Sequence, residues 1–182
     1  LHDSILNELA ALLMRGDAPV FSPEFQQAFE VLTERLREIV NNLRPTMLAF
    51  GLKLALQDFA ENLMERNQDS VEIVVEVQAD GEWRYPEVVE NNLYRIVQEA
   101  CENALRYAHA KRITIFGRLR QNEFDIRIED DGIGFSSETS LKLDEVLANK
   151  HFGLAGMYER ASLIGAEMSI HSQQGQGTRI KV

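Results

Sequence analysis

Glu99 and Asn103 are the first pair of residues whose types and spacing could carry chemistry. They are four residues apart within residues 86–108, whose apolar pattern predicts a helix, so both side chains share one face beside the apolar stripe. A carboxylate and an amide oxygen so placed are suitable ligands for a Mg2+ ion that keeps most of its shell for water and phosphate groups. The pair alone leaves open the alternative of two polar side chains on a solvated face.

A glycine-containing motif, Asp130-Asp131-Gly132-Ile133-Gly134-Phe135, stands where a predicted buried strand ends and a long loop begins. Gly132 and Gly134 would let the backbone approach a flat ligand closely. Asp130 could accept a hydrogen bond from an exocyclic amine such as that of adenine. A tight turn capped by an aspartate is the alternative interpretation of this motif by itself.

Further glycines lie towards the end of the chain. Gly153 and Gly156 open a predicted helix, where exposed N–H groups and the positive end of the helix dipole favour phosphate. Thr178, which follows Gly177 on the last predicted strand pair, adds a hydroxyl. These glycines match neither the GxGxxG dinucleotide fingerprint nor the P-loop, because a third glycine and a Gly-Lys-Ser/Thr sequence are missing. Both of those classes of site are therefore excluded.

The elements that must position these residues follow from the periodicity of the apolar residues. The sequence predicts helices over 52–66, 86–108 and 153–165, strands over 71–78, 112–120, 123–130, 166–173 and 177–182, and a long loop over 135–152. Helices gathered on one face of a mostly antiparallel sheet would make an α+β sandwich. Loops of this length are often lids.

The apolar pattern of the first 45 residues predicts a helical hairpin. Residues 1–14 are amphipathic, and between Phe25 and Leu43 apolar residues repeat at alternating spacings of four and three, as in a coiled-coil seam. Two such helices cannot bury their apolar stripes alone, so a second copy that completes a four-helix bundle is expected. We therefore divide the chain into a helical hairpin over 1–45 and a sheet-containing domain over 46–182.

Composition narrows the possible functions. The 182 residues carry 19 basic and 29 acidic side chains, a net charge of -10, which disfavours direct binding to nucleic acid. Cys101 is the only cysteine and lies among apolar helix positions, so a buried, inert thiol in a reducing cytosol is expected. No segment of the sequence reaches the roughly 20 apolar residues of a membrane span. We expect a cytoplasmic location, with any membrane anchor in parts outside this chain.

Four motifs, QEACENALRYAHA, DDGIGF, HFGLAGMYERA and GQGT, occur in this order in the sequence. In order and spacing they closely resemble the nucleotide-binding boxes of the histidine-kinase-type ATPases of the Bergerat fold. The hairpin ahead of them resembles the dimerisation and phosphoacceptor region of the sensor histidine kinases whose phosphoacceptor motif begins His-Asp. The resemblance implies a two-component sensor histidine kinase that uses ATP and Mg2+.

The same resemblance implies a role for each matched residue. Asn103, with help from Glu99, would bind Mg2+, and Asp130 would bind the adenine amine. The other expected ATP-binding residues are Arg106, Tyr107, Gly132, Gly134, Gly153, Leu154, Gly156, Gly177 and Thr178, with residues 135–152 as the ATP lid. The subfamily usually has Lys-His where Arg106-Tyr107 stand, so the positive charge is kept.

The segment His2-Asp3-Ser4-Ile5-Leu6-Asn7 resembles the phosphoacceptor motif. It implies that His2 attacks the γ-phosphate while Asp3 holds the proton of the other ring nitrogen, which is chemistry that a neutral imidazole beside a carboxylate can perform. Asn7 stands where the family usually has the Gln that is linked to dephosphorylation of the response regulator. The expected partners are a second copy, bound through the hairpin, and a response regulator receiver domain. A core histidine on the apolar side of the helix is the alternative for His2.

Two other functions stay open at this point. The motifs also fit a nucleotide-dependent switch that binds ATP without transferring phosphate. They also fit the gyrase, chaperone and mismatch-repair branch of the same fold. The His-Asp hairpin disfavours this branch, because those enzymes carry different flanking domains.

Overall fold

The computed structural model describes residues 29, 45–68, 70–81, 84–135 and 152–182. The chain divides into two compact units, Leu1–Thr46 and Met47–Val182. The helical hairpin predicted over residues 1–45 lies almost wholly outside the described residues, so the architecture is that of the second unit.

The described residues form one 3-10 helix, three α-helices and five strands. In chain order these are η1 (Thr46–Phe50), α3 (Leu52–Arg66), β1 (Glu72–Ala79), α4 (Glu87–Arg106), β2 (Arg112–Arg120), β3 (Glu123–Asp130), α6 (Phe152–Leu163), β4 (Ser169–Ser172) and β5 (Thr178–Lys181). The ends of α3, β2 and β3 agree with the prediction. The apolar pattern does not predict η1, and it starts β4 three residues too early, because Ala166 still donates its N–H to Ala161 O at the end of α6.

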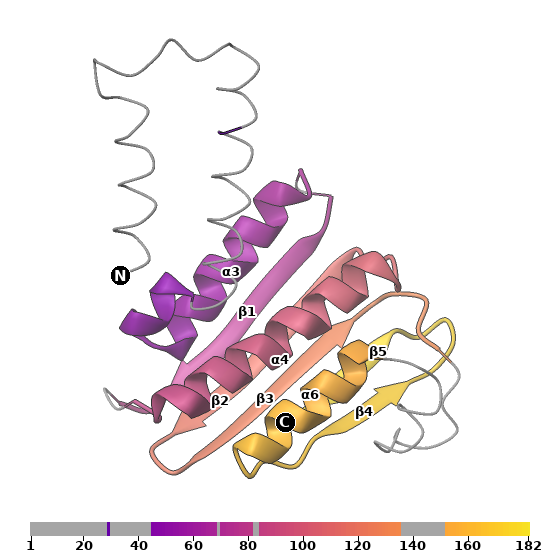
Figure 1. Cartoon of the computed structure of the whole chain (residues 1–182). Coiled ribbons are helices and arrows are strands. Elements are labelled where there is room, and N and C mark those ends of the chain that lie inside the picture. Colours follow the sequence, from indigo (N-terminus) through magenta and orange to yellow (C-terminus); the bar gives the residue numbers. More distant parts are fainter. Residues whose placement is uncertain (1–28, 30–44, 69, 82–83, 136–151) are drawn as a thin grey trace, which may run out of the picture. The chain divides into compact units, whose positions relative to one another are not determined.

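The five strands form one sheet in the order β1-β2-β3-β5-β4 (Figure 1). β1 and β2 are parallel, with α4 between them in the chain, whereas the other neighbouring strands are antiparallel. Figure 1 shows α3, α4 and α6 together on one face of the sheet. The predicted α+β sandwich, with helices on one face of a mostly antiparallel sheet, is therefore confirmed.

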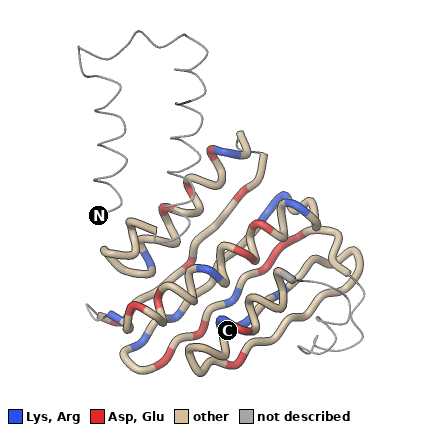
Figure 2. Tube along the Cα trace, in the orientation of Figure 1, with Lys and Arg blue, Asp and Glu red and all other residues tan. Residues whose placement is uncertain are grey.

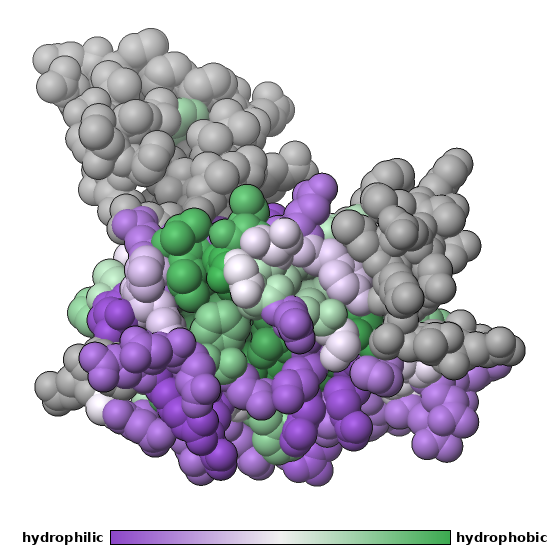
Figure 3. Space-filling view, turned by 90° about the horizontal axis from the view of Figure 1, so that it is seen from below, coloured by the Kyte–Doolittle hydropathy of each residue, from purple (hydrophilic) through white to green (hydrophobic). Residues whose placement is uncertain are grey.

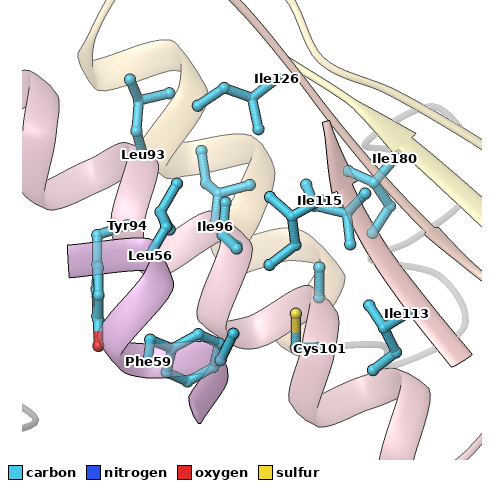
Figure 4. Close-up of a cluster of buried hydrophobic side chains, with 14 of the residues drawn as sticks. Leu56, Phe59, Leu93, Tyr94, Ile96, Cys101, Ile113, Ile115, Ile126 and Ile180 are labelled. Atoms are coloured by element: carbon cyan, nitrogen blue, oxygen red, sulfur yellow. The ribbon is translucent and has the colours of Figure 1, made fainter. Parts of the chain in front are cut away.

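The core lies between this sheet and its helices. Alternate residues of β2 and β3, such as Ile113, Ile115 and Ile126, are buried, as expected for strands with one covered face. Figure 4 shows Leu56 of α3 and Ile96 of α4 among the side chains that meet them. Burial of large aliphatic side chains contributes about 1.5–3 kcal/mol each, so this contact between α4 and the sheet holds the site-bearing helix in place.

Cys101 lies in this core on α4. Its side chain is fully buried, and burial raises the pKa of the thiol well above its ordinary value. Because the thiolate is the reactive form of cysteine, this environment keeps the side chain unreactive. The prediction of a buried, inert thiol is confirmed.

An ion pair between a buried carboxylate and a half-exposed arginine, which the sequence did not predict, joins η1 to the start of α4. Glu90 is 4% exposed and accepts a hydrogen bond from Arg84 Nε at 2.8 Å, with a second from Arg84 Nη2. The same guanidinium donates to the carbonyl oxygens of Leu48 and Ala49, at 2.5 and 2.8 Å. A carboxylate can be buried at this depth because a bidentate arginine satisfies it.

The sheet face opposite the helices is charged. Figure 2 shows acidic and basic residues interspersed along neighbouring strands. Arg112 pairs with Glu72 across β1 and β2 at 3.6 Å, and Lys181 pairs with Asp125 across β3 and β5 at 3.1 Å. Exposed pairs of this kind contribute about 0–1 kcal/mol each, so the charges mainly keep this face in contact with water.

Some apolar side chains of the helical layer stay exposed, among them Phe50, Leu54 and Leu163. The view in Figure 3 shows hydrophobic residues gathered on one face, with hydrophilic residues along its border. Within the described residues, no helix combines the length and the apolar character that crossing a membrane requires.

Candidate functional site

The two chemistry-bearing residues of α4 lie together, as their spacing predicts. Asn103 donates from Nδ2 to Glu99 Oε1 at 3.2 Å, and both side chains are half-buried. The start of α6 packs against this pair. A Cβ at Gly153 would lie only 2.2 Å from Glu99 Oε1 and 3.4 Å from Asn103 Nδ2, so glycine allows the contact. The tertiary structure therefore joins two motifs that are 50 residues apart in the chain.

This cluster has the donors that a magnesium ion needs. Because Asn103 uses its amide nitrogen towards Glu99, the amide oxygen is not engaged in that bond. An amide oxygen and a carboxylate are hard ligands of the kind that Mg2+ takes while it keeps water and phosphate oxygens in its remaining positions. The residues present thus fit the ion that the resemblance implies.

The consecutive aspartates at the end of β3 do different things. Asp131 is exposed, and its Oδ1 accepts hydrogen bonds from the backbone N–H groups of Lys111 and Arg112 at 2.8 and 2.9 Å. It therefore anchors the start of β2. Asp130 is half-buried and accepts a hydrogen bond from Gly132 N at 2.9 Å.

The Asp130 carboxyl group lies in a partly desolvated environment. Burial raises its pKa above the ordinary value, whereas hydrogen bonds from Gly132 and Thr178 oppose part of the rise. Folding thus favours the protonated form of Asp130. A partly desolvated carboxylate is the kind of group whose charge a hydrogen-bond donor of a ligand stabilises.

We expect opposite effects of Asp→Asn changes at these two positions. Asp131→Asn should lower the free energy of unfolding by about 1 kcal/mol, because two charge-assisted hydrogen bonds become neutral ones. Asp130→Asn should leave it unchanged or raise it. The raised pKa of Asp130 means that its charge disfavours the folded state above the folded pKa and has no effect below the unfolded pKa. Any gain from Asp130→Asn should therefore shrink as the pH falls in urea unfolding measured between neutral and acidic pH.

Two glycines of the predicted ATP-binding set are explained by contacts within the protein. β3 and β5 pair with Asp130 opposite Thr178. Gly177, with φ +77°, lies so close to this pair that a Cβ would be 1.9 Å from Asp130 O. Gly134, with φ +58°, has Gln173 O at 2.2 Å from its Cβ position. Both glycines are therefore required for the turn after β4 to lie against the motif after β3.

Gly132 connects the same motif to the end of α4. Its Cβ position is 2.5 Å from Ala108 Cβ and 2.6 Å from Ala108 O, and Ile133 N donates to Ala108 O at 2.9 Å. The aspartate motif therefore packs directly on the residues that follow Asn103 in the chain.

The remaining predicted residues are placed as follows. Arg106 and Tyr107 are exposed at the end of α4, where the guanidinium lies 5.9 Å from the Tyr107 ring centroid and 3.7 Å from Glu102. Leu154 is partly buried against the core. No heavy atom of the described residues beyond its own helix backbone and chain neighbours lies within 4 Å of the Cβ position of Gly156.

Some of the predicted site residues are not among the residues that the structure describes. His2, Asp3 and Asn7 lie outside the described residues, as do residues 136–151 of the predicted lid. The packing of α4, α6 and the paired strands β3 and β5 brings together the glycine motifs, Asp130 and the Glu99–Asn103 pair.

Ser172 contacts two of these segments and was not predicted from the sequence. It is 8% exposed, and its Oγ lies 2.9 Å from Phe135 N and 3.0 Å from Thr178 Oγ1. Strand alternation could have found it, because Ser172 is two residues after the buried Ile170 and so faces the same side of β4.

Comparisons with known proteins agree with this arrangement. Residues 88–182, just over half of the chain, match the family described as histidine kinase-, DNA gyrase B-, and HSP90-like ATPase. Over its whole length the chain is 30% identical to an uncharacterized sensor-like histidine kinase of Chloroflexus aurantiacus, of which it covers 32%. It is 29% identical to the sensor histidine kinase LiaS of Bacillus subtilis and 30% identical to the sensor protein VraS of Staphylococcus aureus, of which it covers 51% and 52%.

The chain thus spans a third to a half of the length of these curated relatives. Among solved structures, the histidine kinase domain of the blue-light activated histidine kinase from Erythrobacter litoralis EL346 matches with a TM-score of 0.60. The match has 15% identity and covers 98% of this chain and 93% of that one, which shows a common fold. From the matched residues, the relatives and the fold, we conclude that the chain belongs to the histidine kinase-, DNA gyrase B-, and HSP90-like ATPase family and contains the ATP-binding domain of a sensor histidine kinase of two-component signalling.

Proposed function

We propose that this chain is the catalytic core of its kinase, which uses ATP and Mg2+ to phosphorylate His2 and then passes the phosphoryl group to an aspartate of a response regulator receiver domain. The observation that carries the proposal is the contact of the glycine at the start of α6 with the polar pair of α4, where Gly153 lies against Glu99 and Asn103.

The phosphate end of the site would lie at this contact. Asn103 and Glu99 would hold Mg2+, which supplies positive charge to the β- and γ-phosphates when it is bound. Gly153 lies in the first turn of α6, where backbone N–H groups have no intrahelical partner and favour phosphate oxygens, and Gly156 lies in the next turn. The exposed Arg106, three residues after Asn103, adds a cation on the same side of α4.

The adenine end would lie where Asp130 of β3 pairs with Thr178 of β5. The Asp130 carboxylate would accept a hydrogen bond from the exocyclic amine, and Thr178 faces Asp130 across the strand pair. Gly132, Gly134 and Gly177 keep the backbone around this carboxylate compact. A solved full-length ShkA in complex with AMPPNP, similar to this chain with a TM-score of 0.58 and 15% identity, supports an adenine nucleotide as the ligand.

The phosphoacceptor in this proposal is His2. A ring nitrogen of the neutral imidazole attacks the γ-phosphorus, the N–P bond forms, the bond from that phosphorus to the β–γ bridging oxygen breaks, and ADP leaves. Asp3 takes or holds the proton of the other ring nitrogen, so the phosphorylated ring need not carry a full positive charge. Asn7, at the motif position that is linked to dephosphorylation of the response regulator, would take part in that hydrolysis.

The proposal also assigns the two parts of the chain and their partners. Residues 1–45 would form the dimerisation and phosphotransfer hairpin, and residues 46–182 the ATP-binding catalytic domain. The partners are a second copy of the chain and the receiver domain. The names of LiaS and VraS as sensors support a catalytic part of a longer sensor. A cytoplasmic location of this part, with the stimulus read by segments outside this chain, belongs to the same proposal.

Incubation with γ-labelled ATP and Mg2+ tests the proposal. The unaltered chain should acquire acid-labile label, as expected for phosphohistidine. His2→Gln should lose the label but keep nucleotide binding, because the nucleotide site lies in the other part of the chain. Asn103→Asp should lose both, because a second carboxylate beside Glu99 repels the phosphates and disturbs the donor set.

The matched control is His171→Gln, since His171 is an exposed histidine of β4. It should be labelled like the unaltered chain. Label that persists in His2→Gln, or that resists acid, would refute His2 as the phosphoacceptor. Nucleotide binding without any label would leave the nucleotide-dependent switch as the function.

A further inference from the structure

Ser172 joins three backbone and side-chain groups around the adenine end of the proposed site. Phe135 N donates to Ser172 Oγ at 2.9 Å. The same oxygen lies 3.0 Å from Gly177 O and 3.0 Å from Thr178 Oγ1. The side chain is 8% exposed, so water does not replace these bonds easily.

The number of protons restricts the possible hydrogen bonds. A serine hydroxyl has one proton and two lone pairs, and one lone pair accepts from Phe135 N. Its single proton can be donated to Gly177 O or to Thr178 Oγ1. Thr178 in turn stands opposite Asp130 in the β3–β5 pair, and its hydroxyl lowers the pKa of that carboxyl group. When Ser172 donates to Thr178, the donors of Phe135 and Ser172 are aligned in one direction, towards the strand pair that holds the Asp130 carboxylate. Hydrogen bonds aligned in this way strengthen one another.

Ser172 also links the two segments that surround Asp130. The segment Asp130–Phe135 lies against the turn of residues 173–177, where Gly175 N donates to Ile133 O at 2.7 Å. The hydrogen bond from Phe135 N to Ser172 Oγ is a second connection, which joins the end of the segment to the residue before the turn. Loss of the hydroxyl would free the far end of the segment and one partner of Thr178 at the same time.

We propose that Ser172 is a positioning residue for base recognition, which holds Thr178 and the Asp130–Phe135 segment so that the Asp130 carboxylate meets the amine of adenine; this inference rests on the proposed ATP site. Guanine carries a carbonyl oxygen where adenine carries that amine, and a carboxylate held in place repels it. The position of Asp130, and not only its presence, would therefore set the preference for adenine over guanine nucleotides.

The test compares ADP and GDP binding by calorimetry to the full 182-residue chain and to Ser172→Ala. Ser172→Ala should reduce the preference for ADP over GDP by about tenfold, the factor that corresponds to one net hydrogen bond. Ser172→Cys, which keeps the size of the side chain but is a weak donor and acceptor, should fall in between. Ser169→Ala on the same strand is the control and should keep the preference of the unaltered chain.

A second measurement does not depend on nucleotide. Amide hydrogen exchange at Phe135 should accelerate in Ser172→Ala and not in Ser169→Ala, because only the first change removes its acceptor. An unchanged ADP to GDP preference in a folded Ser172→Ala, or an equal loss of affinity for both nucleotides, would overturn the positioning role. If the unaltered chain binds neither nucleotide, the proposed ATP site itself fails, whatever the exchange at Phe135 shows.

Discussion

Gly153→Ala should weaken binding of Mg2+ and ATP by about 10- to 100-fold while the domain stays folded. The added methyl group would lie 2.2 Å from Glu99 Oε1, so the carboxylate must move away from Asn103. The atom that must move is the far end of a flexible side chain, and alanine favours a helix over glycine by about 0.5–1 kcal/mol. Thermal unfolding should therefore change little. Calorimetric titration with ATP, with and without Mg2+, measures the loss.

Gly156→Ala is the comparison within the same helix. Among the described residues, no heavy atom beyond its own helix backbone and chain neighbours lies within 4 Å of the new methyl group, so the change should stabilise the domain by about 0.4–1 kcal/mol. ATP affinity should still fall if the phosphates lie against this part of α6. A Gly153→Ala protein that binds MgATP like the unaltered chain would show that Glu99 has no role in holding the ion.

Among the glycines near the paired ends of β3 and β5, Gly177 should be the one whose change to alanine destabilises the domain most. Its φ of +77° is unfavourable for alanine, and the methyl group would lie 1.9 Å from Asp130 O, which is backbone and cannot rotate away. We expect a loss of about 2–5 kcal/mol, as left-handed strain and overpacking add. The pairing of Asp130 with Thr178 should open, and ATP binding should be lost with it. Urea unfolding followed by circular dichroism measures the free energy.

Gly175→Ala separates the two causes. Gly175 has the same φ of +77° in the same turn, but of the described residues beyond its chain neighbours none places a heavy atom within 4 Å of the new methyl group. It should lose only about 1–2 kcal/mol, from backbone strain alone. Equal losses for the two variants would contradict a steric cause at Gly177.

Local patterns predicted the elements that carry the site. The spacing of Glu99 and Asn103 placed them on one face of α4, where the structure joins them by a hydrogen bond. Alternation of apolar residues predicted β2 and β3 with their observed ends. These signals are reliable because helix and strand periodicity depend only on neighbouring residues. The order of the motifs further implied an ATPase of the histidine kinase type, which the matched family confirms.

The resemblance assigned a role to Asp130, but no role for Asp131 followed from the sequence. Asp131 directly follows β3 and accepts hydrogen bonds from the backbone at residues 111 and 112, which only the pairing of β2 with β3 brings near. The same holds for Arg84 and Glu90, whose ion pair reaches back to η1. Partners so far apart in the chain leave no periodic signal.

The sequence by itself therefore predicted the α-helices and strands of the described part of the chain, the family, and most of the polar residues and glycines of the proposed site. Only the tertiary structure decided why each glycine is needed. Gly132, Gly134 and Gly177 allow close backbone contacts within the protein, whereas Gly153 makes room for Glu99. The physical reason is that packing requires a glycine only where other atoms occupy the position of a Cβ. Those atoms belong to segments that folding brings near.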